Sequence, residues 1–288
     1  MIPGAFAYHR PKSVKEAVAI LADLGDDARP LAGGHSLIPV MKLRLAAPAN
    51  LVDLAGIADL KGIRQDGGEV VIGAMTTQAE VIASDLLAAT VPILREAAHV
   101  IADPQVRNVG TIGGNAANGD PGNDMPAVMM TLDARYVLAS RGGERTVPAR
   151  GFYRGVYLTG LNPGEVLTAV RIPVPPKGHG YAYEKLKRKV GDYATAAAAV
   201  VLTLTGGKVA TCAVGLTNVG DHALLAEEAA RILVGSSLDA ATVKQAKAAA
   251  EAITSPATDG HGPAAYRTKM AGVMLERALA RAKARAGG

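Results

Sequence analysis

A cluster of prolines, Pro173, Pro175 and Pro176, divides this chain of 288 residues more sharply than any other feature of its sequence. Proline has no backbone N–H and a fixed φ, so a central β-strand cannot continue through such a cluster. Strand-like segments lie on both sides of it, and the chain is too long for one ordinary compact core. The sequence therefore predicts a domain boundary at residue 176.

The segment before the prolines alternates between helix-like and strand-like patterns. Ser13 and Glu16 have the spacing of a capping box and open an apolar helical repeat that ends at Gly25. The first of these segments form a small mixed unit that ends near residue 55. The expected elements are strands at 29–31, 51–54, 70–73, 136–138, 145–147 and 166–172 and helices at 14–24, 37–45, 77–87, 92–101 and 125–132.

The segment after the prolines predicts an antiparallel sheet covered by helices. Gly206 and Gly207 mark a hairpin turn between two strand-like runs. The run 196–199 consists of alanines and fits either a helix or a strand. The expected elements are strands at 181–186, 200–205 and 209–216 and helices at 222–233, 239–252 and 263–284.

Two glycine-rich segments predict where a ligand binds. They are Ala32-Gly33-Gly34-His35-Ser36, which Leu37 follows, and Thr111-Ile112-Gly113-Gly114-Asn115. Each places adjacent glycines beside a small hydroxyl side chain, so backbone N–H groups can approach a phosphate without a Cβ in the way. Neither segment fits the P-loop or the Rossmann glycine pattern. We expect one ligand with two phosphates, held from two sides; a tight turn that binds nothing is the alternative for the first segment.

A long stretch without periodicity, 103–124, surrounds the second glycine segment. Such stretches are either disordered or functional, and the density of Gly, Asn, Asp and Pro here favours function. Asp124 at its end is expected to accept hydrogen bonds from ribose hydroxyls; capping the following helix is the alternative. The spacing of an EF-hand calcium loop is absent.

Composition excludes several classes of site. Cys212 is the only cysteine and the six histidines are scattered, so the chain is not expected to hold a disulfide, an iron–sulfur cluster or a zinc ion. Any redox centre must be an organic cofactor or lie in a partner. With no Trp and two Phe, the net charge of +5 does not indicate nucleic-acid binding. No apolar run approaches the ~20 residues of a membrane span and no secretory signal is visible, which predicts a cytoplasmic protein.

The two glycine segments, together with Lys185-x-x-Arg188-x-x-x-Asp192, resemble the FAD-binding subunit of molybdenum hydroxylases, the xanthine dehydrogenase family. The resemblance covers the whole chain, and within that family it is greatest to the medium subunits of aerobic carbon monoxide dehydrogenases. It implies an α+β protein: a two-part FAD-binding fold of the vanillyl-alcohol-oxidase (PCMH) type, followed by a C-terminal antiparallel sheet with helices. The expected domains are 1–55 and 56–176, which bind FAD, and 177–288.

The resemblance also implies a role for each site residue. The two glycine segments would hold the FAD diphosphate, and Asp124 would bond the ribose or ribityl region. Lys185 would lie near the pyrimidine edge of the isoalloxazine, although it could instead belong to a solvated basic face. Tyr193 would stack on the ring or shield it, unless it is an ordinary tyrosine. No catalytic or metal-binding residue is expected, and the expected FAD-binding residues are Ala32, Gly33, Gly34, His35, Ser36, Leu37, Ile101, Thr111, Ile112, Gly113, Gly114, Asn115, Asp124, Leu167, Lys185 and Tyr193.

The function implied by the resemblance is electron transfer within a larger oxidoreductase. Electrons would pass from a molybdenum cofactor in a large subunit, through [2Fe-2S] clusters in a small subunit, to FAD in this chain. An external acceptor, either a quinone of the respiratory chain or NAD, would then receive them. The family implies a cytoplasmic heterohexamer, free or loosely attached to the inner face of a membrane, in which this chain is not catalytically complete alone.

Two other functions stay open at this point. A self-sufficient flavin oxidase of the vanillyl-alcohol-oxidase type could carry covalent FAD at His35, because some of those enzymes attach the flavin to a histidine in a similar segment. A non-catalytic sensor of nucleotide phosphates would need only the two glycine segments.

Overall fold

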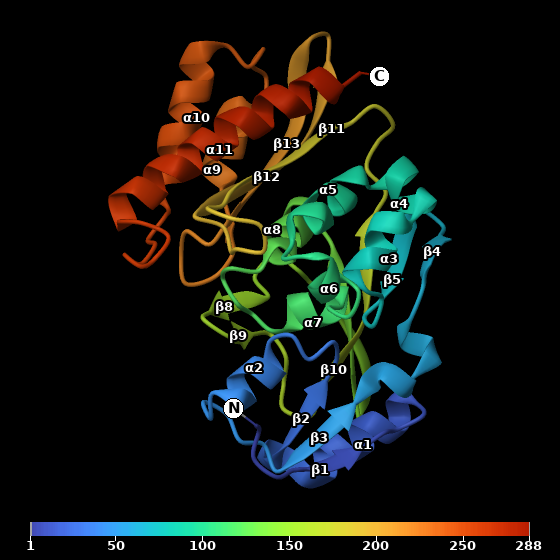
Figure 1. The fold of residues 1–288 in the computed structure, drawn as a ribbon. Coiled ribbons are helices and arrows are strands. Elements are labelled where there is room, and N and C mark those ends of the chain that lie inside the picture. Colours follow the sequence, from blue (N-terminus) through green and yellow to red (C-terminus); the bar gives the residue numbers. More distant parts are fainter. Residues whose placement is uncertain (1, 288) are drawn as a thin grey trace.

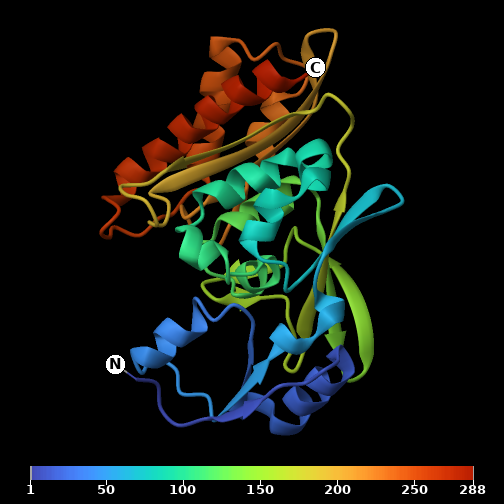
Figure 2. The ribbon, with the colours of Figure 1, turned by 45° about the vertical axis from the view of Figure 1, so that its right-hand side comes forward.

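The computed structural model describes residues 2–287, which form three successive groups of elements, each built on a sheet of its own (Figure 1). The first group lies at one end of the molecule and the C-terminal helices lie at the other (Figures 1 and 2). The α+β fold class predicted from the sequence is confirmed.

The first group is a parallel sheet of three short strands in the order β1-β3-β2. Helix α1 begins after Ser13, whose hydroxyl accepts the Glu16 N–H, and ends at Gly25. Its apolar face packs on this sheet and also contacts Ala139 and Val166 of the second sheet, so α1 joins the two. The elements are β1 (Ala7–His9), α1 (Val14–Leu24), η1 (Gly25–Asp27), β2 (Ala28–Leu31), α2 (Leu37–Lys42), β3 (Asn50–Asp53), η2 (Leu54–Gly56) and η3 (Ala58–Leu60).

The second group is a five-stranded antiparallel sheet in the order β4-β5-β10-β6-β7, with helices packed against it. Helix α8 is buried along its whole length, as expected for a helix that is apolar on all sides. The elements are β4 (Ile63–Asp66), β5 (Glu69–Gly73), α3 (Gln78–Ala83), α4 (Asp85–Thr90), α5 (Pro92–Val100), α6 (Pro104–Arg107), α7 (Ile112–Ala117), α8 (Asp124–Thr131), β6 (Arg135–Ser140), β7 (Gly143–Pro148), β8 (Tyr153–Gly155), β9 (Leu158–Thr159) and β10 (Val166–Pro173).

The third group is an antiparallel sheet in the order β11-β12-β13-β14. Figure 2 shows this sheet between the C-terminal helices on one side and the helices of the second group on the other. The elements are β11 (Gly180–Leu186), β12 (Ala196–Thr205), β13 (Lys208–Thr217), β14 (Leu224–Leu225), α9 (Glu227–Leu233), α10 (Ala240–Ala252) and α11 (Ala264–Arg285).

The alanine run 196–199, which fitted either a helix or a strand, is the start of β12. Ala196 and Ala198 pack into the core beneath the C-terminal helices, whereas Ala197 and Ala199 pack into the core of the second group. A strand buried on both faces reads as a continuous apolar run, which explains why its periodicity was uninformative. The small side chains also let the sheet approach α8 closely: a Cβ on Gly215 would lie 2.6 Å from Thr131 Oγ1.

Several predicted boundaries were wrong. The helix expected at 77–87 is two helices, α3 and α4, because Ser84 ends the first and its hydroxyl caps the second by accepting the Leu87 N–H. The stretch 103–124 contains two short helices, α6 and α7. The helix expected from residue 222 begins only at Glu227, since Leu224–Leu225 pairs with β13, and β4 was not anticipated.

Candidate functional site

The two glycine segments lie directly against each other. A Cβ on Gly33 would overlap the carbonyl oxygen of Val109 and would lie 2.8 Å from the Cα of Gly110, the residue before the second segment. A Cβ on Gly114 would lie 3.3 Å from that of Ala32. Gly34 adopts a left-handed φ of 73°, which favours glycine. Segments far apart in the sequence therefore form neighbouring walls of one site.

The first segment presents a row of free backbone donors. Within residues 2–287, the N–H groups of residues 33–37 have no acceptor. The Ser36 side chain makes no capping bond to α2, and the His35 ring bonds only the nearby Gly33 carbonyl, 2.9 Å from Nδ1. Successive unpaired N–H groups in a turn form a concave site for an anion. The first segment thus has the donors that a phosphate needs.

The second segment differs from the expectation, because it begins a helix. The Thr111 hydroxyl caps α7 by accepting the Gly114 N–H at 3.0 Å, and the Gly113 N–H donates to the Ala74 carbonyl at 2.9 Å. These two N–H groups are therefore occupied within the protein rather than available to a phosphate. Gly113 is needed for packing instead: its Cβ would lie 2.5 Å from the Cβ of Ala74.

Asn115 connects the second segment to Asp124. Its side-chain Oδ1 accepts the Met125 N–H at 3.3 Å, and its carbonyl accepts a bond from Asn123 Nδ2 at 2.9 Å. Asn123, not Asp124, is the N-cap residue of α8. The capping alternative for Asp124 is therefore wrong, and its carboxylate is directed elsewhere.

The carboxylate of Asp124 is held in a buried network with two side chains of β11. Lys185 Nζ lies 2.7 Å from Asp124 Oδ2, and the Tyr183 hydroxyl donates to Oδ1 at 2.5 Å. The Lys185 side chain is 2% exposed and that of Asp124 is 4% exposed. Burial raises the pKa of Asp124 above its ordinary value, although Lys185 and Tyr183 both favour the ionised form. Lys185 is thus a buried cation, not part of a solvated basic face.

Ile101 and Leu167, both expected to bind FAD, are buried. Ile101 follows Val100, whose carbonyl accepts bonds at 3.3 Å from both Lys185 and Lys187. Leu167 precedes Thr168, whose carbonyl accepts the Ala74 N–H at 2.9 Å, and Ala74 in turn bonds Gly113. Both residues belong to the same hydrophobic core as Ile112.

Tyr193 lies in the loop between β11 and β12 and packs against the segment between α7 and α8. Its hydroxyl donates to Asp120 Oδ2 at 3.3 Å, and the Tyr157 hydroxyl donates to the same oxygen at 3.2 Å. A Cβ on Gly122 would lie 3.0 Å from the Tyr193 ring. Burial and Asp120 raise the pKa of Tyr193. Its side chain, 45% exposed, is therefore anchored beside the site and open to solvent.

Sequence reasoning missed three polar residues of this region: Asp120, Tyr157 and Tyr183. One signal for Tyr183 was available, because it stands two residues before Lys185 in a strand and must share its face. Nothing comparable indicated Tyr157, which joins Asp120 only through the fold.

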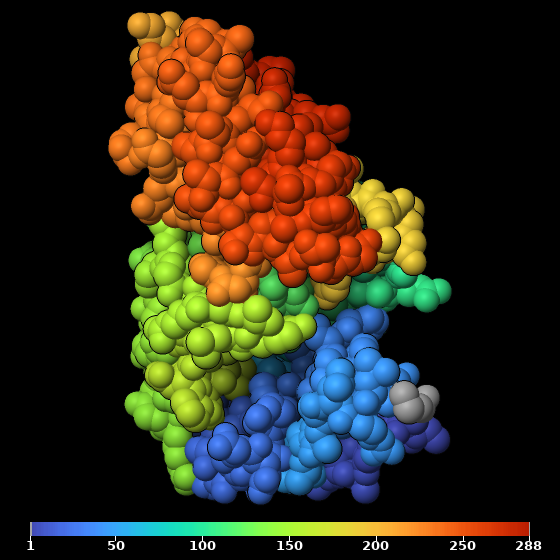
Figure 3. Space-filling model, turned by 90° about the vertical axis from the view of Figure 1, so that its left-hand side faces the viewer, coloured from blue at the N-terminus to red at the C-terminus, as the bar shows by residue number. Residues whose placement is uncertain are grey.

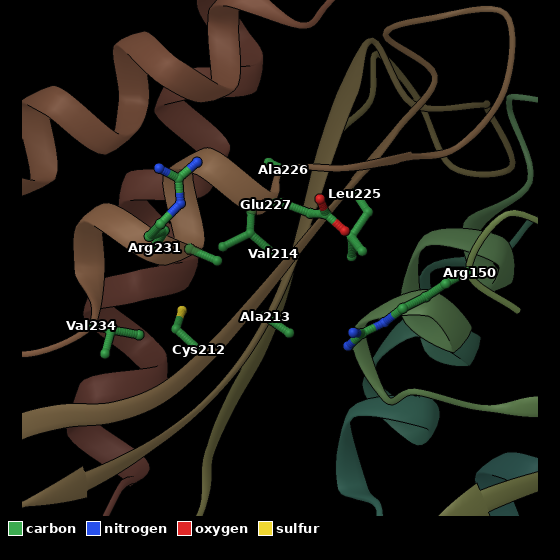
Figure 4. A pocket seen from close by; sticks show the side chains of 10 residues that line it. Arg150, Cys212, Ala213, Val214, Leu225, Ala226, Glu227, Arg231 and Val234 are labelled. Atoms are coloured by element: carbon green, nitrogen blue, oxygen red, sulfur yellow. The ribbon is translucent and has the colours of Figure 1, made fainter. Parts of the chain in front are cut away.

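The surface of the molecule is also hollowed. Figure 3 shows a hollow between the first group, in blue, and the yellow-green segment that precedes β10. A second hollow of about 230 Å³ lies between β13 and α9, lined by Cys212, Val214, Glu227 and Arg231, with Arg150 across from them (Figure 4). It contains none of the predicted site residues, and it is small for a dinucleotide.

The comparisons with known proteins cover the whole chain. The family model "FAD binding domain in molybdopterin dehydrogenase" matches residues 4–175, and "CO dehydrogenase flavoprotein C-terminal domain" matches residues 181–282. The chain is 67% identical to a carbon monoxide dehydrogenase medium chain of Afipia carboxidovorans, over 99% of both chains. It is 52% identical to that of Hydrogenophaga pseudoflava, again over 99% of both. It superposes on a chain of the reconstituted CO dehydrogenase from Oligotropha carboxidovorans with a TM-score of 0.98 and 67% identity, covering 99% of this chain and 100% of that one.

Proposed function

This chain belongs to the molybdenum hydroxylase family as an FAD-containing medium chain of the carbon monoxide dehydrogenase type, and from that premise we propose how its residues hold the flavin and where the electrons go. The observation that carries the proposal is the row of free N–H groups at residues 33–37, directly beside the second glycine segment. The donors suit a diphosphate, and the glycines keep the approach open.

The other site residues fit the remaining parts of FAD. We assign the Ser36 hydroxyl to a phosphate oxygen. Thr111 would line the opposite wall, because its hydroxyl accepts the Gly114 N–H but donates to no acceptor among the described residues. The α7–α8 segment with Asn115 and Asp124 would line the ribose or ribityl chain. When bound, FAD supplies the capacity to accept electrons and pass them on.

The charges of the site suit the isoalloxazine ring. An ammonium group near N1 and O2 stabilises the negative charge that develops there when the ring is reduced. Lys185, a buried cation held by Asp124, would supply this charge. Tyr193 would shield the ring from its anchored position on Asp120, with Ile101 and Leu167 packing beside it.

The partners follow from what this chain holds. Its single cysteine cannot carry an iron–sulfur cluster, and among residues 2–287 no group of three His, Cys, Asp or Glu side chains forms a metal site. We propose that a small subunit with [2Fe-2S] clusters and a large subunit with the molybdenum cofactor oxidise carbon monoxide and reduce the flavin of this chain. A quinone of the respiratory chain, or NAD, would be the acceptor, in a cytoplasmic heterohexamer or one associated with the inner membrane face.

The proposal includes the division of the chain into domains. We assign domains to 1–55, 56–176 and 177–288, because one of the three largest sheets lies in each range. No helix among the described residues is long and apolar enough to cross a membrane.

The self-sufficient oxidase with covalent FAD at His35 is not favoured. The relatives that match over 99% of this chain are medium chains of carbon monoxide dehydrogenase. The His35 ring is exposed and bonded to its own turn through Gly33.

Co-expression of this chain with the large and small subunits of a carbon monoxide dehydrogenase tests the function. The purified complex should contain FAD, molybdenum and iron, carbon monoxide should bleach its flavin absorbance, and acid denaturation should release all FAD from the polypeptide. A complex without flavin, or flavin that stays covalently attached, would contradict the proposal.

A further inference from the structure

Asp124 is held by two different donors, one on each carboxylate oxygen. Lys185 Nζ bonds Oδ2 at 2.7 Å and the Tyr183 hydroxyl bonds Oδ1 at 2.5 Å. The Tyr183 hydroxyl also lies 3.3 Å from Thr217 Oγ1 on β13. Because both oxygens are engaged, the carboxylate cannot rotate without breaking one of these bonds. Hydrogen bonds to an ionised carboxylate are among the stronger kinds.

Tyr183 is itself rigidly placed. Its side chain is 2% exposed, and its backbone N–H donates to Glu96 Oε1 of α5 at 2.9 Å. Tyr183 and Lys185 are two residues apart in β11, so their side chains lie on the same face of the strand, the face that packs against α5 and α8. The strand therefore delivers both donors to the first residue of α8 as a fixed pair.

The ammonium group of Lys185 retains capacity for a ligand. It has three N–H donors, and within residues 2–287 its acceptors are Asp124 and the Val100 carbonyl. The third N–H has no acceptor among the described residues. The direction of this third N–H depends on where Asp124 and the Val100 carbonyl hold Lys185 Nζ.

We propose that Tyr183 is a positioning residue for the flavin: by fixing Asp124, it fixes the Lys185 ammonium that faces the pyrimidine edge. This inference rests on the proposed function, which locates that edge beside Lys185. Without the Tyr183 hydroxyl, Oδ1 loses its donor in a buried place, the carboxylate rotates, and Lys185 moves with it. Both the affinity for FAD and the stabilisation of the reduced ring then fall.

The test is Tyr183→Phe in the assembled complex, with the dissociation constant of FAD and the flavin midpoint potential as readouts. We expect FAD to bind on the order of tenfold more weakly, the effect of one hydrogen bond to a charged group, and the potential to become more negative. The matched control is Tyr153→Phe. It also removes a fully buried tyrosyl hydroxyl from the same core, one that bonds the Tyr136 hydroxyl at 2.5 Å, and it should change neither readout.

A double-mutant cycle separates positioning from a general packing defect. In a Lys185→Met background, Tyr183→Phe should have no further effect on either readout. A full additional effect there would overturn the inference, as would a Tyr183→Phe complex with unchanged affinity and potential. If Lys185→Met alone alters both readouts and Tyr183→Phe alters neither, only the inference fails. If Lys185→Met alters neither, the proposed location of the flavin is wrong and the inference fails with it.

Discussion

Gly33 and Val109 are in backbone contact: the position that a Cβ would take on Gly33 is occupied by the carbonyl oxygen of Val109. This contact closes the two glycine segments against each other. The width of the proposed diphosphate site therefore depends on the absence of one methyl group.

Gly33→Ala should separate the two segments. Because the overlapping atoms belong to backbone, they cannot rotate away, and we expect a loss of about 1–3 kcal/mol in the free energy of unfolding. The amount of FAD bound per folded chain should also fall, because the proposed diphosphate site is widened. Thermal denaturation and flavin released per chain measure the two effects. Gly68→Ala is the control, since its Cβ would meet no atom within 4 Å; equal behaviour of the two variants would contradict the argument.

Asp124→Ala should leave the Lys185 ammonium buried and unpaired. Removing one partner of a buried pair costs about 3–5 kcal/mol, whereas removing one partner of an exposed pair costs about 0–1 kcal/mol. The exposed control is Asp23→Ala, which breaks the ion pair of Asp23 with Arg141. The side chains of Asp23 and Arg141 are 61% and 65% exposed. Urea denaturation of both variants compares them, and a small loss for Asp124→Ala would show that Lys185 finds another way to be neutralised.

Glu165 makes stability dependent on pH. Arg145 Nε and Nη2 donate to its two oxygens at 2.6 and 2.7 Å, and these bonds hold the pKa of Glu165 below its ordinary value. A carboxyl with a lowered folded-state pKa stabilises the protein above its unfolded pKa of about 4.3 and loses that contribution as the pH falls through the folded value.

Glu165→Gln should therefore be less stable than the wild type at pH 6–8, and the difference should shrink below about pH 4. Urea denaturation across this pH range tests the expectation. The exposed neighbour Glu144, changed to Gln, should show no such pattern. A difference for Glu165→Gln that grows toward acid pH would contradict the sign.

Cys212 should be nearly inert in the folded protein. Burial raises the pKa of its thiol to about 12, so at pH 8 the thiolate fraction is on the order of a thousandfold below that of a free cysteine. Iodoacetamide should label the native chain slowly and the denatured chain fast. Because the chain has one cysteine, the labelled mass reports this site alone. Rapid labelling of the native form would show that the reagent reaches a reactive thiol through the hollow between β13 and α9.

Local signals in the sequence predicted much of the fold. Ser13 with Gly25 defined α1, and Gly206 with Gly207, both at positive φ, defined the hairpin between β12 and β13. What could not be predicted depends on distant contacts. Gly113 lies inside a helix, against its intrinsic preference, because Ala74 leaves no room for a Cβ. Its N–H was expected to bind phosphate because nothing local revealed that Ala74 accepts it.

In the candidate site, the glycine segments and Lys185 are residues that the sequence predicts, and their placement relative to one another depends on the fold. Tyr183 was not predicted: its position two residues before Lys185 indicated a shared face, but its bond to Asp124, 59 residues away in the chain, depends on the fold. The ion pair of Asp124 with Lys185 likewise replaces the helix cap that the local sequence allowed.

Strand β11 lies beyond the prolines, yet it supplies Tyr183 and Lys185 to a helix that precedes them. A fragment cut at the prolines would keep both glycine segments but would lose Lys185, the counter-charge of Asp124. It would also expose to water the side of α8 that the alanines of β12 cover. The proline boundary is therefore not a functional boundary, because the charges that we propose for the flavin site come from both sides of it.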